Sequence, residues 1–461
     1  MRSLIRQVTA GFLLALSLVS TPQARAELIA ANDDTRSFYL LPLRNGLSAL
    51  TLVWPMQQVT EERAHAMSAG LLSVITGGTS SRSPHEIHEY LELKGIEQVV
   101  TSTRRHLLLT VSAPNEVFPE TLVHLENLLL ESTYSNDWYQ RDLQAVRIEH
   151  STLTRDPGSV LGEIDGFLNY NPSDASSPPS DQTFRFGRPS HAILRSGDEE
   201  VEQRVAKLLA KLPRHKVNVR VTMPKWLEIM LGRNRFPFEL PTGTIHFQDP
   251  SSSEMLILLA KAQMFEDEPQ MVGANLLVDY IGANQDSEMF RLLRQEMRAS
   301  YDPRSHFVTF DKNKAVILFS TTVEADTWPE IYTTLQSIYQ TVRTGNVAQA
   351  RLEMQRKIKL RRFSDNFFHT PDWGADQLLY EYPNGSDGDI FLPIVDAMET
   401  ASAPDIIASA ETFLPPLENY LLILIGGGDA PSPALKSNGY CALPANTPLK
   451  HCLEKLSNMG N

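Results

Sequence analysis

Two histidines and two glutamates fall within five residues near the start of the chain, in the run His85-Glu86-Ile87-His88-Glu89. Imidazole and carboxylate groups bind zinc in many proteins, so this cluster is one candidate metal site. The overlapping run Ser83-Pro84-His85-Glu86 has the composition of a capping box, with a serine N-cap, proline at the first helical position and glutamate at N3. We therefore interpret the cluster as the first turns of a solvated helix that ends at Lys94-Gly95.

The first 26 residues have the composition of an export signal. Arg2 and Arg6 precede an apolar run at residues 8–20, and Ala24-Arg25-Ala26 is a small-x-small cleavage site. The apolar run is too short to span a bilayer, so we predict a periplasmic protein with no membrane span. Without this signal the chain has 39 basic and 55 acidic residues, a net charge of −16 that is poorly suited to nucleic acid binding.

The chain has two cysteines, Cys441 and Cys452, and both lie near its end. An oxidising compartment favours a disulfide between them, and the alternative is a weak metal site that also uses His451. A basic run, RKIKLRRF at residues 356–363, opposes the acidic average. We interpret it as a solvated basic helix face, and the alternative is a surface for an acidic partner or peptide.

The order of the expected elements is repeated along the chain. Residues 70–77 align with residues 275–282 at an offset of 205, and Phe118-Pro119-Glu120 aligns with Trp328-Pro329-Glu330 at an offset of 210. In both halves, a strand-like run precedes this Pro-Glu segment and a charged amphipathic helix follows it. The repeat predicts an α+β protein of two similar domains, each with helices packed on a mainly antiparallel sheet.

The predicted domain boundaries follow from the signal, the repeat and the Pro-rich run NRFPFELPTG. Residues 1–26 are the signal peptide and residues 27–233 the N-terminal domain. Residues 234–243 form the linker, residues 244–430 the C-terminal domain, and residues 431–461 a tail that carries the two cysteines.

The stretch before the histidine cluster carries a family resemblance. Residues 64–75 have helical periodicity and are followed by Gly78-Thr79, the capped helix and a strand-like run. In this order and spacing the chain resembles the pitrilysin/insulinase family of zinc metallopeptidases, over nearly its whole mature length. Active members carry His-x-x-Glu-His ahead of the Gly-Thr, which would place that motif at residues 69–73. Here these residues read Ala69-Gly70-Leu71-Leu72-Ser73, and Glu149 lies where the distal zinc ligand would be.

The resemblance also points to a site in the second domain, to which family members contribute an arginine and a tyrosine seven residues apart. Arg294 and Tyr301 match this pair within SEMFRLLRQEMRASY. Positions i and i+7 share one face of a helix, so we expect both side chains on one helix, facing one cavity. The chain departs from the family's Gly-Leu-Ala before the tyrosine, which is Arg298-Ala299-Ser300 here, and from its glycine-rich approach, which is Gly282-Ala283-Asn284-Gln285.

The resemblance implies a clamshell of two domains and a subunit that is not an active peptidase alone. Some bacterial members are heterodimers, in which one subunit binds zinc and the other supplies the Arg/Tyr pair. On this hypothesis the chain binds no cofactor, a homologous partner holds zinc, and Arg294 and Tyr301 complete the site for a peptide substrate. The alternative is a pseudo-peptidase that is a scaffold or peptide-binding protein. A stand-alone peptidase using His85, His88 and Glu89 is a third hypothesis, and its motif geometry is wrong.

Overall fold

The computed structural model describes the chain in the ranges 35–39, 42–56, 61–102, 106–151, 156–169, 186–213, 239–249, 251–311, 314–373, 391–427, 439–444 and 447–459. The predicted signal peptide and residues 234–238 of the predicted linker lie outside these ranges. Across the described ranges, no helix has the length and apolar character needed to cross a membrane.

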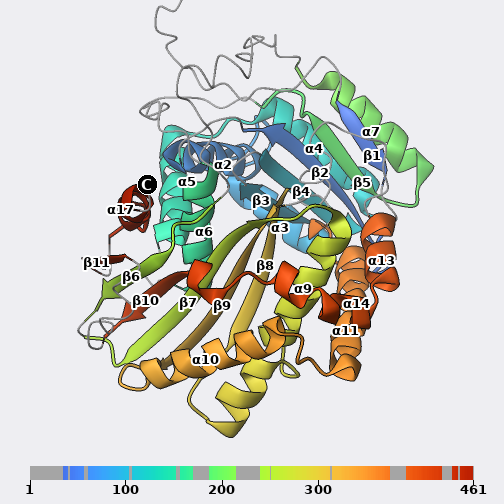
Figure 1. Ribbon diagram of the computed structural model, residues 1–461. Helices are drawn as coiled ribbons and strands as arrows, with labels where there is room; N and C mark the ends of the chain where they lie inside the picture. The colour runs from blue at the N-terminus through green and yellow to red at the C-terminus, as the bar shows by residue number, and fades with distance from the viewer. Residues whose placement is uncertain are drawn as a thin grey trace, which may run out of the picture.

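Two sheets form the frame of the molecule, one from each half of the sequence (Figure 1). The first has the order β1-β5-β2-β4-β3, with bounds β1 Arg36–Tyr39, β2 Leu47–Pro55, β3 Glu97–Ser102, β4 His106–Pro114 and β5 His191–Arg195. The second has the order β11-β6-β10-β7-β9-β8, with bounds β6 Gly243–Gln248, β7 Glu254–Met264, β8 Arg304–Asp311, β9 Lys314–Glu324, β10 Leu421–Gly426 and β11 Tyr440–Pro444.

Helices connect the strands and cover the sheets. In the first half they are α2 Glu61–Thr76, α3 Pro84–Lys94, α4 Phe118–Glu131, α5 Asn136–Ser151, α6 Pro157–Asn169 and α7 Glu199–Lys211. In the second half they are α9 Glu268–Gly282, the π-helix η2 Phe290–Glu296, α10 Trp328–Arg343, α11 Gln349–His369, α13 Phe391–Thr400, α14 Ala403–Ala408, α15 Ala410–Phe413, the 3₁₀ turn η3 Leu417–Asn419 and α17 Lys450–Met459.

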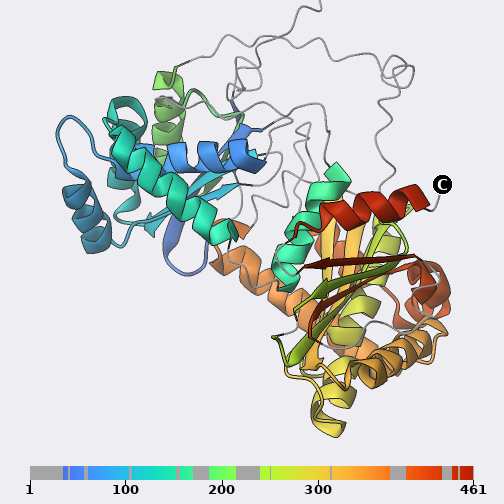
Figure 2. The ribbon, with the colours of Figure 1, turned by 90° about the vertical axis from the view of Figure 1, so that its left-hand side faces the viewer.

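The two sheets repeat one pairing pattern. In the first, β1 pairs parallel with β5, and the pairs β5–β2, β2–β4 and β4–β3 are antiparallel. In the second, β6 pairs parallel with β10, and the pairs β10–β7, β7–β9 and β9–β8 are antiparallel. Strand β11 then extends the second sheet, parallel to β6. The predicted α+β fold of two similar, mainly antiparallel, helix-covered domains is confirmed, and Figure 2 shows the two domains side by side.

Strand alternation builds the core of the first domain. Leu50, Leu52 and Trp54 are alternate residues of β2, so they point to the same face of the sheet. All three are almost fully buried in one cluster with side chains of α2, α4 and α7. The indole N–H of Trp54 donates to the carbonyl of Gly187 at 2.8 Å, which satisfies the polar atom of the largest core residue.

Helix α6 belongs to the first half of the sequence but packs on the second sheet. Val160 and Ile164 are fully buried, in a cluster with Ile245 and Phe247 of β6 and with residues of β7, β9, β10 and α17. Two described helices therefore cover this face, α6 from the first half and α17 from the end of the chain, and they lie together (Figures 1 and 2).

The end of the chain is attached to this layer by a disulfide. Cys441 on β11 and Cys452 on α17 are bonded, with their Cα atoms 5.6 Å apart, and both are buried. The backbone N–H of Leu449 donates to the Glu163 carboxylate of α6 at 2.5 Å. The pairing expected for an oxidising compartment is therefore present, and it ties α17 to the edge of the second sheet.

The C-terminal end of α11 is held by the first domain. Arg195, the last residue of β5, is 1% exposed and donates from Nη1 to the carbonyl of Thr370 at 3.0 Å and from Nη2 to the carbonyl of Phe367. The last carbonyls of a helix have no partner within the helix and carry partial negative charge, so a cation stabilises them. Burial lowers the pKa of Arg195 to about 10, which leaves the guanidinium charged at neutral pH.

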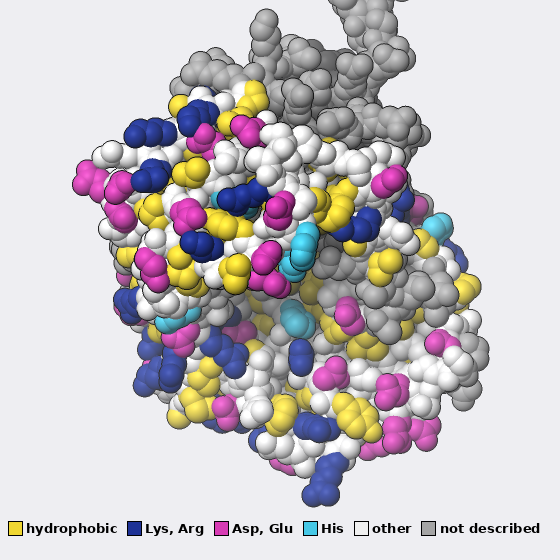
Figure 3. All heavy atoms as spheres, turned by 180° about the vertical axis from the view of Figure 1, so that it is seen from behind, with side chains coloured by type: hydrophobic (Ala, Val, Ile, Leu, Met, Phe, Trp, Pro, Cys, Tyr) yellow, Lys and Arg dark blue, Asp and Glu magenta, His cyan; other side chains and the backbone are white. Residues whose placement is uncertain are grey.

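The basic run on α11 is a partly structural feature. Arg356 donates to the carbonyl of Met398 at 2.9 Å, and Lys359 pairs with Asp279 of α9 at 2.6 Å. Lys357 and Arg361 are exposed, and Lys and Arg side chains gather at the side of the second domain where α11 lies (Figure 3). The interpretation of this run as a solvated face is therefore wrong for Arg356 and Lys359, which attach α11 to neighbouring helices.

A buried histidine joins α3 to α4. His124 is 6% exposed, and its ring lies 4.8 Å from the Tyr90 ring. Burial, the largest cause, and the Arg82 charge lower the pKa of His124, the Glu120 charge opposes them, and the resulting pKa is about 4. His124 is therefore neutral in the folded protein at pH 7.

We expect Arg195→Ala to lower the free energy of unfolding by about 3 kcal/mol, because it leaves buried carbonyls without their charged donor. Urea denaturation followed by circular dichroism measures this loss. Arg44→Ala is the control, because the exposed Arg44 guanidinium stacks on Phe368, 3.6 Å from the ring centroid. Losing that contact should cost about 1 kcal/mol or less. Equal losses in the two variants would contradict the role assigned to Arg195.

The folded-state pKa of His124 lies below the value of about 6.5 expected in the unfolded chain. The unfolded state therefore takes up a proton first as the pH falls, and stability is lost between about pH 6.5 and pH 4. His124→Phe keeps the contact with Tyr90 and cannot be protonated. We expect this variant to lose about 2 kcal/mol less than the wild type between pH 7 and pH 4, measured by urea unfolding at both values. Parallel losses in the two proteins would show that another group causes the acid sensitivity.

Candidate functional site

At the positions of the family's zinc motif, the side chains of this protein pack between two helices. Ala69 and Ser73 of α2, where the two histidines would lie, are both fully buried. Ala69 packs against Tyr139 and Leu143 of α5, and Ser73 Oγ donates to Asp142 Oδ2 at 2.8 Å. This part of the first domain is therefore a helix–helix contact with one buried hydrogen bond.

Glu149, at the position of the distal zinc ligand, belongs to α5, and its side chain lies outside the described residues. Among the residues that the structure does describe, no three His, Cys, Asp or Glu side chains form a group that could hold a metal ion. Neither half of the family's metal site can thus be assembled from described side chains.

The histidine cluster that opens α3 has the predicted local structure. Ser83 Oγ accepts from the backbone N–H of Glu86, and the Glu86 carboxylate accepts from the backbone N–H of Ser83. The capping box is therefore confirmed, as is the left-handed C-cap at Gly95. His85 and Glu89 are exposed, and His88 pairs with Glu92 one turn later at 3.2 Å.

A cavity of about 460 Å³ lies at the loop between α2 and α3, directly after the degenerate motif. Most of its lining residues carry hydroxyl groups or are glycines: Gly77, Gly78, Thr79, Ser80, Ser81, Arg82, Ser83, Pro84, Thr133, Ser135 and Trp138. The loop is held by a β-bridge between Thr79 and Ser132. The loop between α2 and α3 therefore lines a polar depression.

Arg294 and Tyr301 lie together on the second domain. The Arg294 guanidinium carbon is 5.7 Å from the centroid of the Tyr301 ring, and Nη1 donates to the carbonyl of Ser300 at 3.1 Å. Both side chains are exposed, and Tyr301 is 61% exposed. The pair is accessible, and neither residue lines the cavity between α2 and α3.

The expected single helix through Arg294 and Tyr301 is wrong. Arg294 lies in the π-helix η2, which ends at Glu296, and Arg298 then adopts a left-handed φ of 55°. The chain turns back, so that the carbonyl of Ser300 reaches the Arg294 guanidinium. The two side chains lie close together because the chain turns between them, and their i, i+7 spacing on a helix does not explain the contact.

The backbone around Tyr301 is bonded to the second sheet. The N–H of Tyr301 donates to the carbonyl of Thr322 at 3.4 Å, and the N–H of Thr322 donates to Asp302 Oδ1 at 3.0 Å. The hydroxyls of Ser300 and Thr321 also share a hydrogen bond. The backbone at Tyr301 is therefore bonded to the end of β9, while its ring is exposed.

The two sequence departures from the family have different structural results. Arg298 has a left-handed φ that a glycine would adopt readily, so this turn carries a charged side chain. Gly282 is required by packing, because a Cβ there would lie 2.8 Å from Met289 Sδ and 2.9 Å from the backbone nitrogen of Ser305.

Solved structures share this fold. A peptidase M16 inactive domain from Pseudomonas fluorescens superposes with a TM-score of 0.65 at 14% identity, over 89% of this chain and 100% of that one. A protease from Helicobacter pylori superposes with a TM-score of 0.62 at 12% identity, over 87% and 100%. The ferredoxin protease FusC, in complex with Arabidopsis ferredoxin, superposes with a TM-score of 0.58 at 13% identity, over 89% of this chain and 46% of that one.

The chain has the peptidase M16 fold. This is the fold that the resemblance to pitrilysin and insulinase implied, and at this level the resemblance is confirmed. Comparison of the sequence with protein-family models and with curated proteins gives no match.

Sequence reasoning did not find the polar network beside Arg294. Glu288, Arg291, Arg351 and Tyr280 line a second cavity of about 410 Å³ between η2, α10 and α11. The spacing of Glu288 and Arg291 at i and i+3 was a readable signal for one of these ion pairs. Arg351 comes from a distant helix, and no local pattern links it to Glu288.

We expect Arg298→Gly to leave stability unchanged or to raise it by up to about 1 kcal/mol, because a left-handed residue with a Cβ is strained and glycine is not. Thermal unfolding measures the change. Arg298→Ala, which keeps the Cβ, removes the same charge and should bring no gain. A destabilised glycine variant beside an unaffected alanine variant would show that φ at this position is not strained.

Proposed function

We propose that this protein is a non-catalytic subunit of a periplasmic zinc metalloendopeptidase, and that it completes the peptide-binding site of a homologous, zinc-bearing partner. The observation that carries the proposal is the placement of Arg294 and Tyr301. They lie side by side, exposed, on a segment that is bonded to the second sheet.

The first domain supports a non-catalytic role for the chain itself. Catalytic zinc needs three protein ligands and an open position for water. The positions of the family's histidines hold Ala69 and Ser73, which are buried in the contact between α2 and α5. The hydrolytic metal is therefore assigned to the partner subunit, and no cofactor is assigned to this chain.

The pair has the chemistry that the second half of such a site requires. The Tyr301 hydroxyl is a neutral donor that can stabilise the oxyanion formed when a metal-bound water attacks a peptide carbonyl. The Arg294 guanidinium can hold a substrate carbonyl or carboxylate through two parallel hydrogen bonds. Its Nη1 group already donates to the carbonyl of Ser300, which limits its freedom to rotate away.

Two further observations are consistent with this assignment. One solved structure that shares the fold over 100% of its own chain is a peptidase M16 inactive domain from Pseudomonas fluorescens. The N-terminal residues have the composition of an export signal, and the disulfide between Cys441 and Cys452 suits the oxidising periplasm.

Isolation of the tagged mature protein from its native periplasm, with mass spectrometry of the co-purified proteins, is the first test. We expect a stoichiometric relative that carries His-x-x-Glu-His. A protein that elutes alone, or with an unrelated assembly, would replace the proposal with the alternative of a pseudo-peptidase scaffold or peptide-binding protein.

In the reconstituted complex we expect Tyr301→Phe to lower kcat by about 10²-fold, because one donor to the oxyanion is lost. Arg294→Gln should raise KM. Arg361→Gln is the control for the loss of an exposed arginine, since Arg361 is 85% exposed on α11. Steady-state kinetics on a fluorogenic peptide measure all three variants. Unchanged turnover in Tyr301→Phe would refute the role of the pair.

A further inference from the structure

The turn that carries Arg294 has an unusual backbone. Its helical segment η2 is a π-helix, and the N–H of Met297 donates to the carbonyl of Leu292 at 2.9 Å, five residues earlier. π-helical turns are rare, and many occur at functional sites. Such a turn persists only when surrounding interactions favour it over the α-helix.

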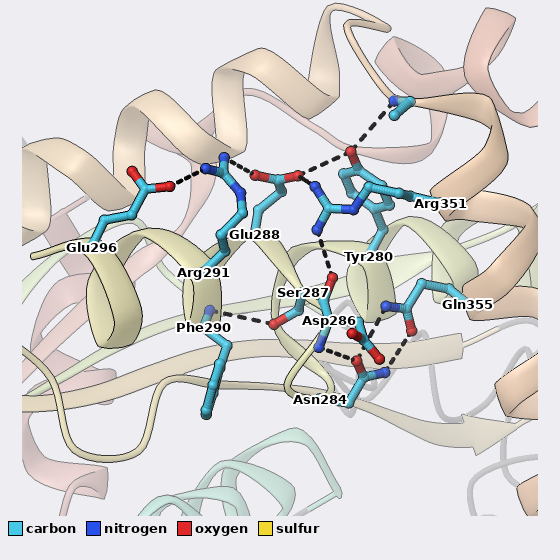
Figure 4. A network of polar contacts seen from close by, with 11 residues as sticks. Tyr280, Asn284, Asp286, Ser287, Glu288, Phe290, Arg291, Glu296, Arg351 and Gln355 are labelled. Carbon is cyan, nitrogen blue, oxygen red and sulfur yellow. Dashed lines mark hydrogen bonds and ion pairs between the residues drawn. The ribbon is translucent and has the colours of Figure 1, made fainter. Parts of the chain in front are cut away.

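One carboxylate joins this turn to the rest of the domain (Figure 4). Glu288 lies two residues before the start of η2, and its side chain is 13% exposed. It pairs with Arg291 of η2 at 2.7 Å and with Arg351 of α11, and it accepts from the Tyr280 hydroxyl of α9 at 3.1 Å. Burial raises the pKa of Glu288, but Arg291 and Arg351 outweigh it, so the pKa lies below its ordinary value and the carboxylate is ionised at neutral pH.

The network favours the π-helical register. Arg291 also pairs with Glu296, five residues later, and this spacing brings two side chains together in a π-helix. In an α-helix the neighbouring positions are i+3 and i+4. Glu288 holds the other side of the Arg291 guanidinium, and it is the less exposed of the two carboxylates, so it is the stronger attachment (Figure 4).

The network continues into α11 with helical periodicity. Arg351, Gln355 and Lys359 are spaced at i, i+4 and i+8, so they lie on one face. Arg351 bonds Glu288, Gln355 exchanges hydrogen bonds with Asn284, and Lys359 pairs with Asp279. Glu288 thus fixes η2 to a helix that is attached along its length.

The backbones of Tyr301 and Arg294 have separate attachments, and the bond from Arg294 Nη1 to the carbonyl of Ser300 connects the two segments. The Tyr301 backbone is bonded to β9, whereas Arg294 belongs to η2. The distance between the two side chains therefore depends on the register of η2 relative to the sheet.

We propose that Glu288 is the positioning residue of the Arg294/Tyr301 pair. Its ionised carboxylate holds η2 in the π-helical register through Arg291 and Arg351, and that register sets the Arg294 guanidinium beside Tyr301. The value of this geometry for catalysis rests on the proposed function, but the positioning itself can be measured on the isolated chain.

Hydrogen exchange followed by mass spectrometry on the full mature chain tests the positioning. Glu288→Gln keeps the size of the side chain and removes its charge. We expect the amides of residues 290–300, including the N–H groups of Met297 and Ala299, to exchange about 10-fold faster, with unchanged exchange in β9 and an unchanged Tm. Glu296→Gln is the matched control, because Glu296 pairs with the same Arg291 and is 56% exposed. It should leave exchange in this segment within about twofold of the wild type, since exposed ion pairs contribute little.

Unchanged exchange in Glu288→Gln, or faster exchange across the whole second domain, would overturn the proposal. The second outcome would mean that Glu288 stabilises the domain without setting η2. If Glu288→Gln does not fold, Tyr280→Phe removes only the hydroxyl that donates to Glu288. Tyr280→Phe should accelerate exchange in the same segment by about threefold. Unchanged exchange in this variant would equally count against the proposal.

Kinetics of the complex separate this inference from the proposed function. Faster exchange with a raised KM in Glu288→Gln supports both, because Arg294 is the group assigned to substrate binding. Faster exchange with unchanged kinetic constants keeps the positioning role and overturns the function of the pair. Unchanged exchange overturns the positioning role whatever the turnover, and Tyr301→Phe then tests the function alone.

Discussion

The fold depends on a buried cation at the end of a helix. Arg195 leaves the first sheet and donates to the last carbonyls of α11, a helix that belongs to the second domain. A 21-residue helix is about 30 Å long, so this contact fixes one end of a rod whose other end lies beside η2. Because Arg195 holds the C-terminal end of α11, the orientation of this helix is fixed. Its ion pairs and its side-chain amide hydrogen bonds with neighbouring segments therefore keep their geometry.

The first half of the chain in turn supplies a helix to the second sheet. Helix α6 precedes β5 of the first sheet in the sequence, yet its apolar residues are buried against β6, β7 and β10 of the second. The second sheet is thus covered in part by a helix that the first half of the chain supplies. The disulfide between Cys441 and Cys452 belongs to the same layer, where α17 lies next to α6. The position of η2 is set within the second domain, by Glu288 and its contacts with Arg291 and Arg351.

Local features of this fold could be read from the sequence because their causes are local. The capping box at Ser83, the C-cap at Gly95 and the repeated Phe/Trp-Pro-Glu starts of α4 and α10 each depend on a few neighbouring residues. The repeat also indicated two similar sheets. The clamp at Arg195, the packing of α6 on the second sheet and the contact of Arg351 with Glu288 could not be read, because they join residues far apart in the chain. The π-helix was missed for the same reason: its backbone register is held by Arg351, and the segment alone has the spacing of an ordinary helix.

The packing of α6 on the second sheet has a consequence for how the protein can be divided. A cut in the stretch at 234–243 gives two fragments that look like domains by sequence, but the first carries α6 without its sheet and the second carries the end of α11 without Arg195. Each would present a large apolar face to water, which in a free fragment leads to aggregation. Co-expressed, the same fragments would recognise each other through these faces and rebuild the parent molecule. Each half of the chain is therefore incomplete without the other.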